Sequence, residues 1–208
     1  MNFSSSLIED AVNEFARLPG IGKKTALRLV LHLLKQETTQ VERFSHAIAT
    51  MRRDIQFCNT CHNVSDGPTC RICNDTHRKS NQICVVESIR DVMAIEATQQ
   101  YSGTYHILGG LISPLDGVGP ENLHIQSLIR RVEQGTCDEL IMALSPTLEG
   151  DTTVYFITKK VTAFPVKITT LSRGVAFGGE LEYADELTLA RSILNRLPIE
   201  QLISSSES

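Results

Sequence analysis

Two Cys-x-x-Cys pairs lie close together in the sequence and constrain this chain more than any other feature. Cys58 and Cys61 form the first pair, Cys70 and Cys73 form the second, and eight residues separate them. Four thiolates at this spacing satisfy the tetrahedral coordination of one Zn²⁺ ion and leave no position open for a substrate. The intervening residues are polar and rich in turn formers, so they supply almost no hydrophobic core. We therefore predict a small knuckle held by one structural zinc ion per chain.

Two disulfides or four free thiols are the alternatives to zinc. Residues 1–4 lack the basic and apolar character of a signal peptide, and no apolar stretch approaches the ~20 residues of a membrane span. We therefore expect a cytoplasmic protein, in which thiols stay reduced and clustered cysteines favour metal. His62 and His77 are spare candidate ligands. Cys84 and Cys137 lie in apolar runs, where we expect reduced core residues rather than catalytic cysteines.

Charge is unevenly distributed along the chain. Residues 1–80 carry 11 Lys and Arg against 8 Asp and Glu, a net charge of +3, whereas residues 81–208 carry 9 against 16, a net charge of −7. A protein that binds nucleic acid over its whole surface would be basic throughout. The asymmetry instead fits a local basic site in the N-terminal part of the chain.

The N-terminal part has the pattern of two helices joined by a tight turn. The first helix is predicted to end near Leu18, and the second opens with lysine after Gly20-Ile21-Gly22. Glycines let the backbone approach a phosphate, and the N–H groups at the start of the second helix point toward that anion. Lys23, Lys24 and Arg28 add cations. This pattern is typical of a helix-hairpin-helix motif that binds DNA independently of base sequence. A plain helical hairpin with a solvated basic face is the alternative.

Helical periodicity continues in a third segment. Apolar residues recur from Val41 through Phe44, Ile48 and Met51 to Ile55, at alternating spacings of three and four. We expect this stripe to pack on the first two helices as core.

Strands and helices alternate from residue 81 onward. Short continuous apolar runs predict four buried strands, and the segments between them have helical periodicity. The predicted strands are residues 83–86, 104–108, 140–144 and 166–171, and the predicted helices are residues 88–99, 121–133, 152–161 and 185–195. This alternation implies right-handed βαβ units and a parallel sheet, so the fold class is α/β.

Acidic residues follow two of the predicted strands, at the sheet edge where ligands bind in such folds. Glu87 comes directly after the first strand, with Asp91 close behind it, and Glu149 and Asp151 follow the third strand. We interpret these acids as a surface for a basic partner. Solvated loop ends and a weak metal site are the alternatives.

The segment 143–151 resembles the Toprim domain of topoisomerases and primases. That family has a glutamate after its first strand, matched here by Glu87, and a later Asp-x-Asp pair that helps to hold Mg²⁺. In this sequence Ser145 and Thr147 occupy the positions of the two aspartates. Neutral hydroxyls are poor ligands for a hard divalent cation. The resemblance therefore implies the fold but disfavours metal-assisted strand cleavage or polymerisation.

The order of these features is more specific than any one of them. A helix-hairpin-helix is followed by a four-cysteine knuckle, a Toprim-like domain without its aspartate pair, and a segment that begins Gly178-Gly179-Glu180-Leu181-Glu182-Tyr183. In this order they closely resemble the RecR family of bacterial recombination mediators over nearly the whole chain. We place the domains at residues 1–56, 57–80, 81–176 and 177–208, the last being a C-terminal oligomerisation segment with a disordered tail.

The resemblance implies a non-enzymatic DNA-repair protein that forms dimers and ring-shaped tetramers around DNA. It implies that the protein acts with RecO and RecF to load RecA onto single-stranded DNA coated by single-strand-binding protein. It assigns DNA contacts to Lys24 and Arg28, zinc ligation to the four cysteines, partner binding to the acids around Glu87 and Glu149, and subunit exchange to the C-terminal segment. One subunit offers few cations, so several subunits around one duplex would add avidity.

Two other functions compete with this interpretation. The first is an enzyme, a Mg²⁺-dependent Toprim nuclease or topoisomerase that uses Glu87, Glu149 and Asp151. The second is a pure adaptor that binds repair proteins and hardly touches DNA. The enzyme would cleave plasmid DNA, which a mediator would not. The adaptor would keep its DNA affinity when Lys24 and Arg28 are replaced, whereas a DNA-binding mediator would lose it.

Overall fold

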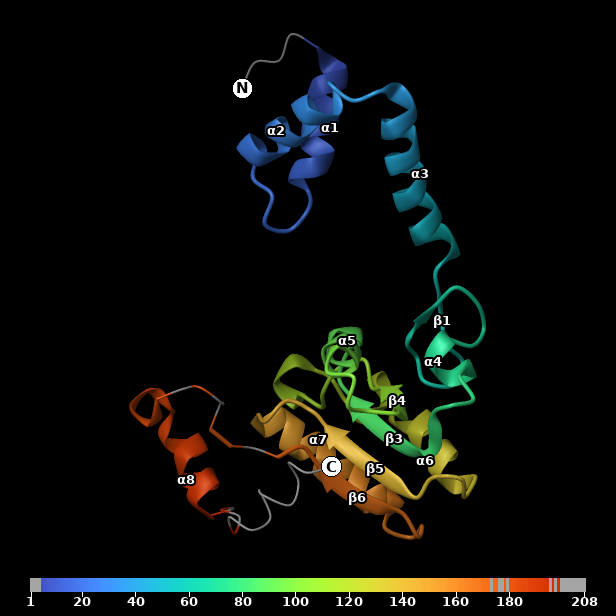
Figure 1. Ribbon diagram of the computed structural model, residues 1–208, viewed down its shortest axis with the longest axis vertical. Coiled ribbons are helices and arrows are strands. Elements are labelled where there is room, and N and C mark those ends of the chain that lie inside the picture. Colours follow the sequence, from blue (N-terminus) through green and yellow to red (C-terminus); the bar gives the residue numbers. More distant parts are fainter. Residues whose placement is uncertain are drawn as a thin grey trace. The chain divides into compact units, whose positions relative to one another are not determined.

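The computed structural model describes residues 5–172, 174, 175, 178, 180–194, 196 and 198 (Figure 1). Contacts within the chain divide it into two compact units, Met1–Ile55 and Gln56–Ser208. None of the helices in this described part combines the length and the apolar character that a bilayer crossing requires. Of the predicted C-terminal segment, residues 177, 179, 195, 197 and 199–208 lie outside the described residues.

The first unit is helical. Helices α1 (Ser6–Ala16) and α2 (Lys23–Leu33) are the predicted hairpin, and helix α3 (Thr38–Asp54) follows. A small core joins α1 to α2 through Val12 and Ala26, both 0% exposed. The helical composition of this unit is therefore confirmed.

The apolar stripe of α3 lies where we did not expect it. None of the residues of α3 is buried, and Phe44, Ile48 and Met51 are 44%, 49% and 55% exposed. The expectation that this stripe packs on α1 and α2 is wrong for the single chain. Periodicity identifies an apolar helix face, but it does not identify the surface that the face meets.

The second unit begins with the knuckle. A two-stranded antiparallel ribbon of β1 (Gln56–Phe57) and β2 (Val64–Ser65) is followed by the one-turn helix α4 (Arg71–Asn74). These short elements carry the four cysteines, as the next subsection describes.

A four-stranded parallel sheet is the centre of the second unit (Figure 1). Its strands are β3 (Lys79–Val86), β4 (Gly103–Ile107), β5 (Glu139–Ala143) and β6 (Lys167–Thr170), in the spatial order β4-β3-β5-β6. Every pairing is parallel, with Val86 opposite Ile107 on one side and Ala143 on the other. The predicted strands and the α/β fold class are confirmed.

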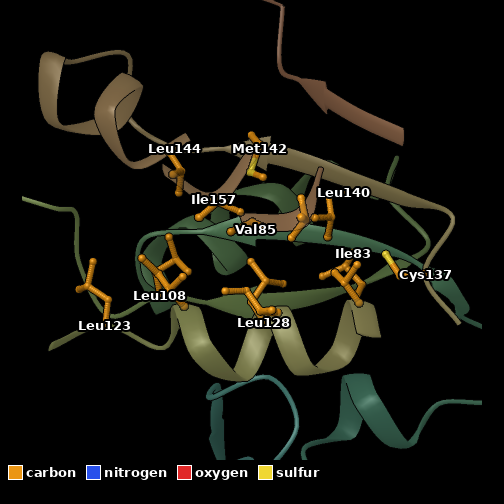
Figure 2. Close-up of a cluster of buried hydrophobic side chains, with 14 of the residues drawn as sticks. Ile83, Val85, Leu108, Leu123, Leu128, Cys137, Leu140, Met142, Leu144 and Ile157 are labelled. Carbon is orange, nitrogen blue, oxygen red and sulfur yellow. The ribbon is translucent and has the colours of Figure 1, made fainter. Parts of the chain in front are cut away.

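Helices cover both faces of this sheet because successive side chains of β3 point to opposite sides. Ile83 and Val85 face a core built with α6 (Ile125–Glu133) and α7 (Leu148–Val161). Cys84 and Val86 face the other core, which includes Val92 of α5 (Ile89–Ala97). Figure 2 shows Leu128 of α6 directed toward the strands in the first of these cores.

The remaining elements are short. Three 3₁₀ turns, η1 (Pro114–Asp116), η2 (Pro120–Asn122) and η3 (Leu181–Tyr183), lie in connections, and helix α8 (Glu186–Leu194) is the last described helix. The segment predicted as one helix over residues 121–133 begins with η2, so α6 starts later than expected.

Helix α7 begins at Leu148, four residues before the predicted start. Thr147 is its N-cap, and the Thr147 hydroxyl accepts a hydrogen bond of 3.2 Å from the backbone N–H of Gly150. A threonine in this role is a strong start signal for a helix. From the sequence we considered Thr147 only as the counterpart of a metal-binding aspartate and not as a helix cap. The predicted start of α7 was therefore too late.

Substituting Gly150 with alanine is expected to destabilise the second unit. Gly150 is buried, and an added Cβ would lie 1.9 Å from the carbonyl oxygen of Ser145, a backbone atom that cannot rotate away. We expect a loss of about 3 kcal/mol in the free energy of unfolding, the upper range for overpacking. Urea denaturation measures it. The control is Gly67→Ala, which meets nothing within 4 Å. Equal unfolding midpoints for the two variants would contradict the packing at Gly150.

Candidate functional site

The four predicted zinc ligands converge on one point. The Sγ atoms of Cys58, Cys61, Cys70 and Cys73 all lie within 4.8 Å of one another, and those of Cys61 and Cys70 are 3.5 Å apart. The first two cysteines flank the turn after β1. Cys70 is the N-cap of α4, and its sulfur accepts from the backbone N–H of Cys73. The prediction of one four-cysteine metal site is confirmed.

The thiol chemistry of this cluster fits a divalent cation. Burial raises the pKa of Cys70 to about 11, and a hydrogen bond to Cys73 together with burial raises the pKa of Cys61. Burial acts against ionisation of Cys58 too, but hydrogen bonds from three backbone groups lower its pKa to about 6. Without an ion, therefore, the cluster resists becoming four thiolates, and Zn²⁺ supplies the charge that makes this state stable.

The two spare histidines are used elsewhere. The His77 side chain is exposed, and its Nδ1 lies 3.2 Å from a carboxylate oxygen of Asp75. The His62 ring stacks on the ring of His124, with 3.8 Å between the ring centroids. Neither is needed to complete the coordination by four cysteines.

His62 attaches the knuckle to the sheet domain. Its Nε2 lies 2.8 Å from the hydroxyl of Ser127 on α6, and its backbone has a positive φ of 63°. One residue earlier, the carbonyl oxygen of Cys61 accepts a hydrogen bond of 2.9 Å from the backbone N–H of Ile107 on β4. Ile72 of α4 packs against the metal cluster and against the α5-side core. The metal site is thus connected to the edge strand of the sheet by backbone, ring and apolar contacts.

A buried polar network continues from this contact into the sheet. His106 on β4 is 0% exposed, and burial lowers its pKa to about 3, so its ring is neutral. Arg131 of α6 donates to Nδ1 of His106 at 3.2 Å and to the carbonyl oxygen of Tyr105 at 2.7 Å. Nε2 of His106 then donates to the carbonyl oxygen of His124 at 2.9 Å. Our sequence interpretation missed this network, because its members are 18 to 26 residues apart and share no motif.

The turn between α1 and α2 has the geometry that the helix-hairpin-helix pattern predicts. Gly20 has a φ of +78°, which favours glycine, and the N–H of Ile21 donates to the carbonyl oxygen of Leu18 at 3.1 Å. Gly22 is the N-cap of α2 and has no side-chain acceptor for the first N–H groups of the helix. The start of α2 therefore presents positive backbone dipoles without a capping side chain.

The predicted cations lie on the surface of α2. Lys23, Lys24 and Arg28 are all exposed, and the first turn of α2 contains no acidic residue. Lys24 and Arg28 line a shallow hollow together with His32 and Lys35. The predicted contact residues are thus gathered on one helix beside the glycine turn. Their contact with DNA stays a prediction.

Glu87 lies at the point where the direction of strand addition reverses. The chain moves outward from β3 to β4 and then returns to add β5 on the opposite side of β3, so the ends of β3 and β5 form a topological switch point. There the hydroxyl of Ser145 donates a hydrogen bond of 2.9 Å to a carboxylate oxygen of Glu87. Ser145 and Thr147, which the sequence resemblance matches to the Toprim aspartates, thus act as a partner of Glu87 and as the cap of α7.

Two of the other three predicted acids, Asp91 and Asp151, have partners in the structure. Asp91 closes a capping box at the start of α5, where it accepts from the backbone N–H of Ser88 at 2.7 Å. Asp151 lies 3.7 Å from Arg191 of α8. Glu149 is half-buried in the first turn of α7. Among the residues that the structure describes, the four cysteines are the one group of three or more ligand side chains close enough to hold a metal ion. Whether the acids bind a partner stays a prediction.

Family models match the chain in four consecutive segments. The matched families are described as the RecR helix-hairpin-helix (residues 8–52), the RecR zinc finger domain of the four-cysteine type (residues 55–75), the Toprim domain (residues 81–172) and the RecR C-terminal region (residues 174–197). The first three segments coincide with structural features described above. The Toprim match covers the four-stranded sheet with its switch point.

Curated relatives match almost the whole chain. Recombination protein RecR of Phocaeicola vulgatus is 57% identical over 194 residues, which cover 93% of this chain and 95% of the relative. Its counterpart from Flavobacterium johnsoniae is 56% identical over 206 residues, 99% and 100% of the two chains. The counterpart from Parabacteroides distasonis is 50% identical over 204 residues, 98% of each chain. With the zinc cluster, the helix-hairpin-helix and the Toprim sheet in the same order, this similarity shows that the chain belongs to the RecR family.

Proposed function

We propose that this protein is a non-enzymatic DNA-binding clamp in recombinational repair. In this proposal it acts with RecO and RecF to promote loading of RecA onto single-stranded DNA that single-strand-binding protein covers. The observation that carries the proposal is a combination within one chain: exposed Lys24 and Arg28 beside a helix-hairpin-helix turn, and a Toprim edge on which hydroxyls replace the aspartate pair.

The geometry of α2 supports sequence-independent DNA binding. The Gly20 turn and the uncapped helix start offer backbone N–H groups to a phosphate, and Lys23, Lys24 and Arg28 add charge beside them. Such contacts fix the position of a duplex but carry no information on its bases. A recombination mediator needs this property, because damage occurs at any sequence.

The switch point supports a role without metal chemistry. Two-metal or one-metal phosphoryl chemistry requires several carboxylates around the ion. Glu87 faces the Ser145 hydroxyl, and Asp91 and Asp151 are engaged at a helix cap and with Arg191. We propose that Glu87 and Glu149 instead form part of an acidic surface for a basic partner protein.

The exposed stripe on α3 supports self-association. Phe44, Ile48 and Met51 are each about half exposed on one helix, which is an apolar area that a second copy of the chain would cover. We propose a homo-dimer or a ring-shaped homo-tetramer in which several helix-hairpin-helix motifs share one duplex. In the same proposal, residues 1–56, 57–80, 81–176 and 177–208 are the functional domains, and the last of them exchanges between subunits.

A reconstituted loading reaction tests this function. Single-stranded DNA is first covered with single-strand-binding protein, and the onset of RecA filament formation is followed by fluorescence. We expect the protein together with RecO, or with RecO and RecF, to shorten the lag before filaments form. Supercoiled plasmid incubated with Mg²⁺ and the protein is expected to stay intact. Nicking that disappears in Glu87→Gln would refute the clamp in favour of a Toprim enzyme. An unchanged lag would refute the mediator role.

A further inference from the structure

We propose that the connection between β4 and α6 carries a binding knob, Leu115, which inserts into an apolar pocket on a basic partner protein. This inference deepens the proposed function and rests on it, since it names the residue that gives the acidic sheet edge its affinity. The connection comprises residues 108–124 and includes the turns η1 and η2.

Leu115 is exposed to an unusual degree. Its side chain is 98% exposed, more than any other large hydrophobic residue that the structure describes. A single exposed leucine on a helix surface needs no explanation. A leucine at the tip of a tight turn, with nearly its whole surface in water, differs because a partner can enclose it from several sides.

The turn that presents Leu115 is held firmly. Ser113 and Val118 pair as an isolated antiparallel bridge, and each backbone N–H donates to the carbonyl oxygen of the other, at 3.0 and 2.9 Å. The Ser113 hydroxyl donates to a carboxylate oxygen of Asp116 at 2.6 Å, and Gly117 closes the turn with a φ of 70°. A preformed turn loses little conformational entropy on binding, which is what a recognition element requires.

Both ends of the connection are fixed in the core. Ile112 and Leu123 are each 7% exposed and belong to the core on the α6 and α7 side of the sheet. The backbone N–H of Ile112 donates to the Thr153 hydroxyl of α7 at 2.9 Å. The knob is therefore held in a defined position relative to α7, the helix whose first turn carries Glu149.

Charge indicates the kind of partner. Residues 108–124 contain Asp116 and Glu121, both exposed, and no Lys or Arg. Glu87 and Glu149 lie at the same carboxyl edge of the sheet, after β3 and β5. This sign of charge repels a DNA backbone and attracts a protein surface rich in Lys and Arg. A central apolar anchor surrounded by a polar rim is the usual arrangement of a protein–protein hot spot.

The test compares Leu115→Ala with wild type, using purified RecO and RecF as the probes. Affinity for each is measured by calorimetry, alongside DNA affinity and the mass of the protein in solution. Leu115→Met retains a long apolar side chain, and Met93→Ala removes a 63% exposed side chain from α5 of the same domain. We expect Leu115→Ala to bind one of the probes about tenfold to a hundredfold more weakly, the equivalent of one leucine left unburied. Leu115→Met and Met93→Ala should stay within about threefold of wild type, because neither removes a buried leucine-sized anchor.

Each other outcome has a distinct meaning. If wild type binds a probe and Leu115→Ala binds it equally well, the knob is refuted and the proposed function stands. A lower mass for Leu115→Ala would place Leu115 between copies of this chain, which also refutes a partner site. If wild type binds neither protein, the partner component of the proposed function fails, and the inference fails with it.

Discussion

Replacing Cys58 with serine is expected to abolish zinc binding and unfold the knuckle. The elements around the site are two-residue strands and one helical turn, so coordination by the four sulfurs is the main source of their stability. Comparable zinc-dependent peptides gain about 10–16 kcal/mol from the metal. A serine hydroxyl does not ionise at neutral pH and is a poor replacement for a thiolate. Zinc per chain, measured with a chromogenic chelator after thiol modification, should fall from one to nearly zero.

The loss is expected to extend into the sheet domain. Cys61 accepts from Ile107 on β4, and His62 stacks on His124 and bonds Ser127, so an unfolded knuckle removes these contacts together. At about 1 kcal/mol for each hydrogen bond, and with the α5-side apolar contact of Ile72 lost as well, we expect a decrease of roughly 2–4 kcal/mol in the free energy of unfolding. Faster hydrogen exchange at the Ile107 amide would show that the loss of stability reaches β4 through the contact with Cys61.

Cys137→Ser is the matched control for this variant. Cys137 lies outside the cluster, and its sulfur donates to the carbonyl oxygen of Glu139 at 3.5 Å, a bond that a serine hydroxyl can replace. It should keep one zinc ion per chain and an unchanged Ile107 amide. Full zinc retention in Cys58→Ser would contradict four-cysteine coordination. Zinc loss without any change at Ile107 would contradict only the coupling to the sheet.

Local signals made much of this architecture predictable. The strand runs of the sheet are continuous and apolar because both faces are covered, and this pattern has few alternatives. The cysteine spacing specifies its own geometry, since two residues between cysteines place both sulfurs on one ion. Gly20 marks a turn with a positive φ that few other residues adopt. In each case the residues that determine the structure are neighbours in sequence.

Features that depend on distant residues were not predictable. The stripe on α3 has the period of a core helix, but its partner surface is not specified by the period. The Ser145 hydroxyl bonds Glu87, a role that requires the positions of β3 and β5 to be known. The contact between His62 and His124 joins residues 62 positions apart. The sequence around Leu115 does not distinguish it from other leucines in loops, because its exposure is visible only in the structure.

The double variant Lys24→Ala/Arg28→Ala is expected to lose most of its affinity for DNA. Both side chains are exposed on α2 beside the Gly20 turn, so their removal should cost no folding stability. If each phosphate contact contributes about 1 kcal/mol, the loss is about 2 kcal/mol, or roughly thirtyfold, for every chain that touches the duplex. In an oligomer the losses accumulate, because each subunit contributes the same contacts.

Salt dependence distinguishes lost phosphate contacts from a damaged fold. The slope of the logarithm of affinity against the logarithm of salt concentration should become shallower by about 1 for each contact removed. Lys159→Ala/Lys160→Ala is the matched control, since it removes two exposed cations from α7 and changes the net charge equally. That control should keep the wild-type slope to within about one contact, because the cations it removes lie outside the helix-hairpin-helix.

The mass of the protein in solution, recorded with each binding curve, shows whether a variant has lost DNA contacts or has lost its oligomeric state. If Lys24→Ala/Arg28→Ala keeps the mass of wild type and loses binding, the cations on α2 hold DNA and the clamp gains direct support. If it binds as tightly as wild type, the helix-hairpin-helix is not the DNA site, and the adaptor hypothesis, with the acidic edge around Glu87 as its centre, takes its place. A strictly monomeric variant with wild-type affinity would show that one chain suffices, which the small number of cations on α2 makes physically difficult.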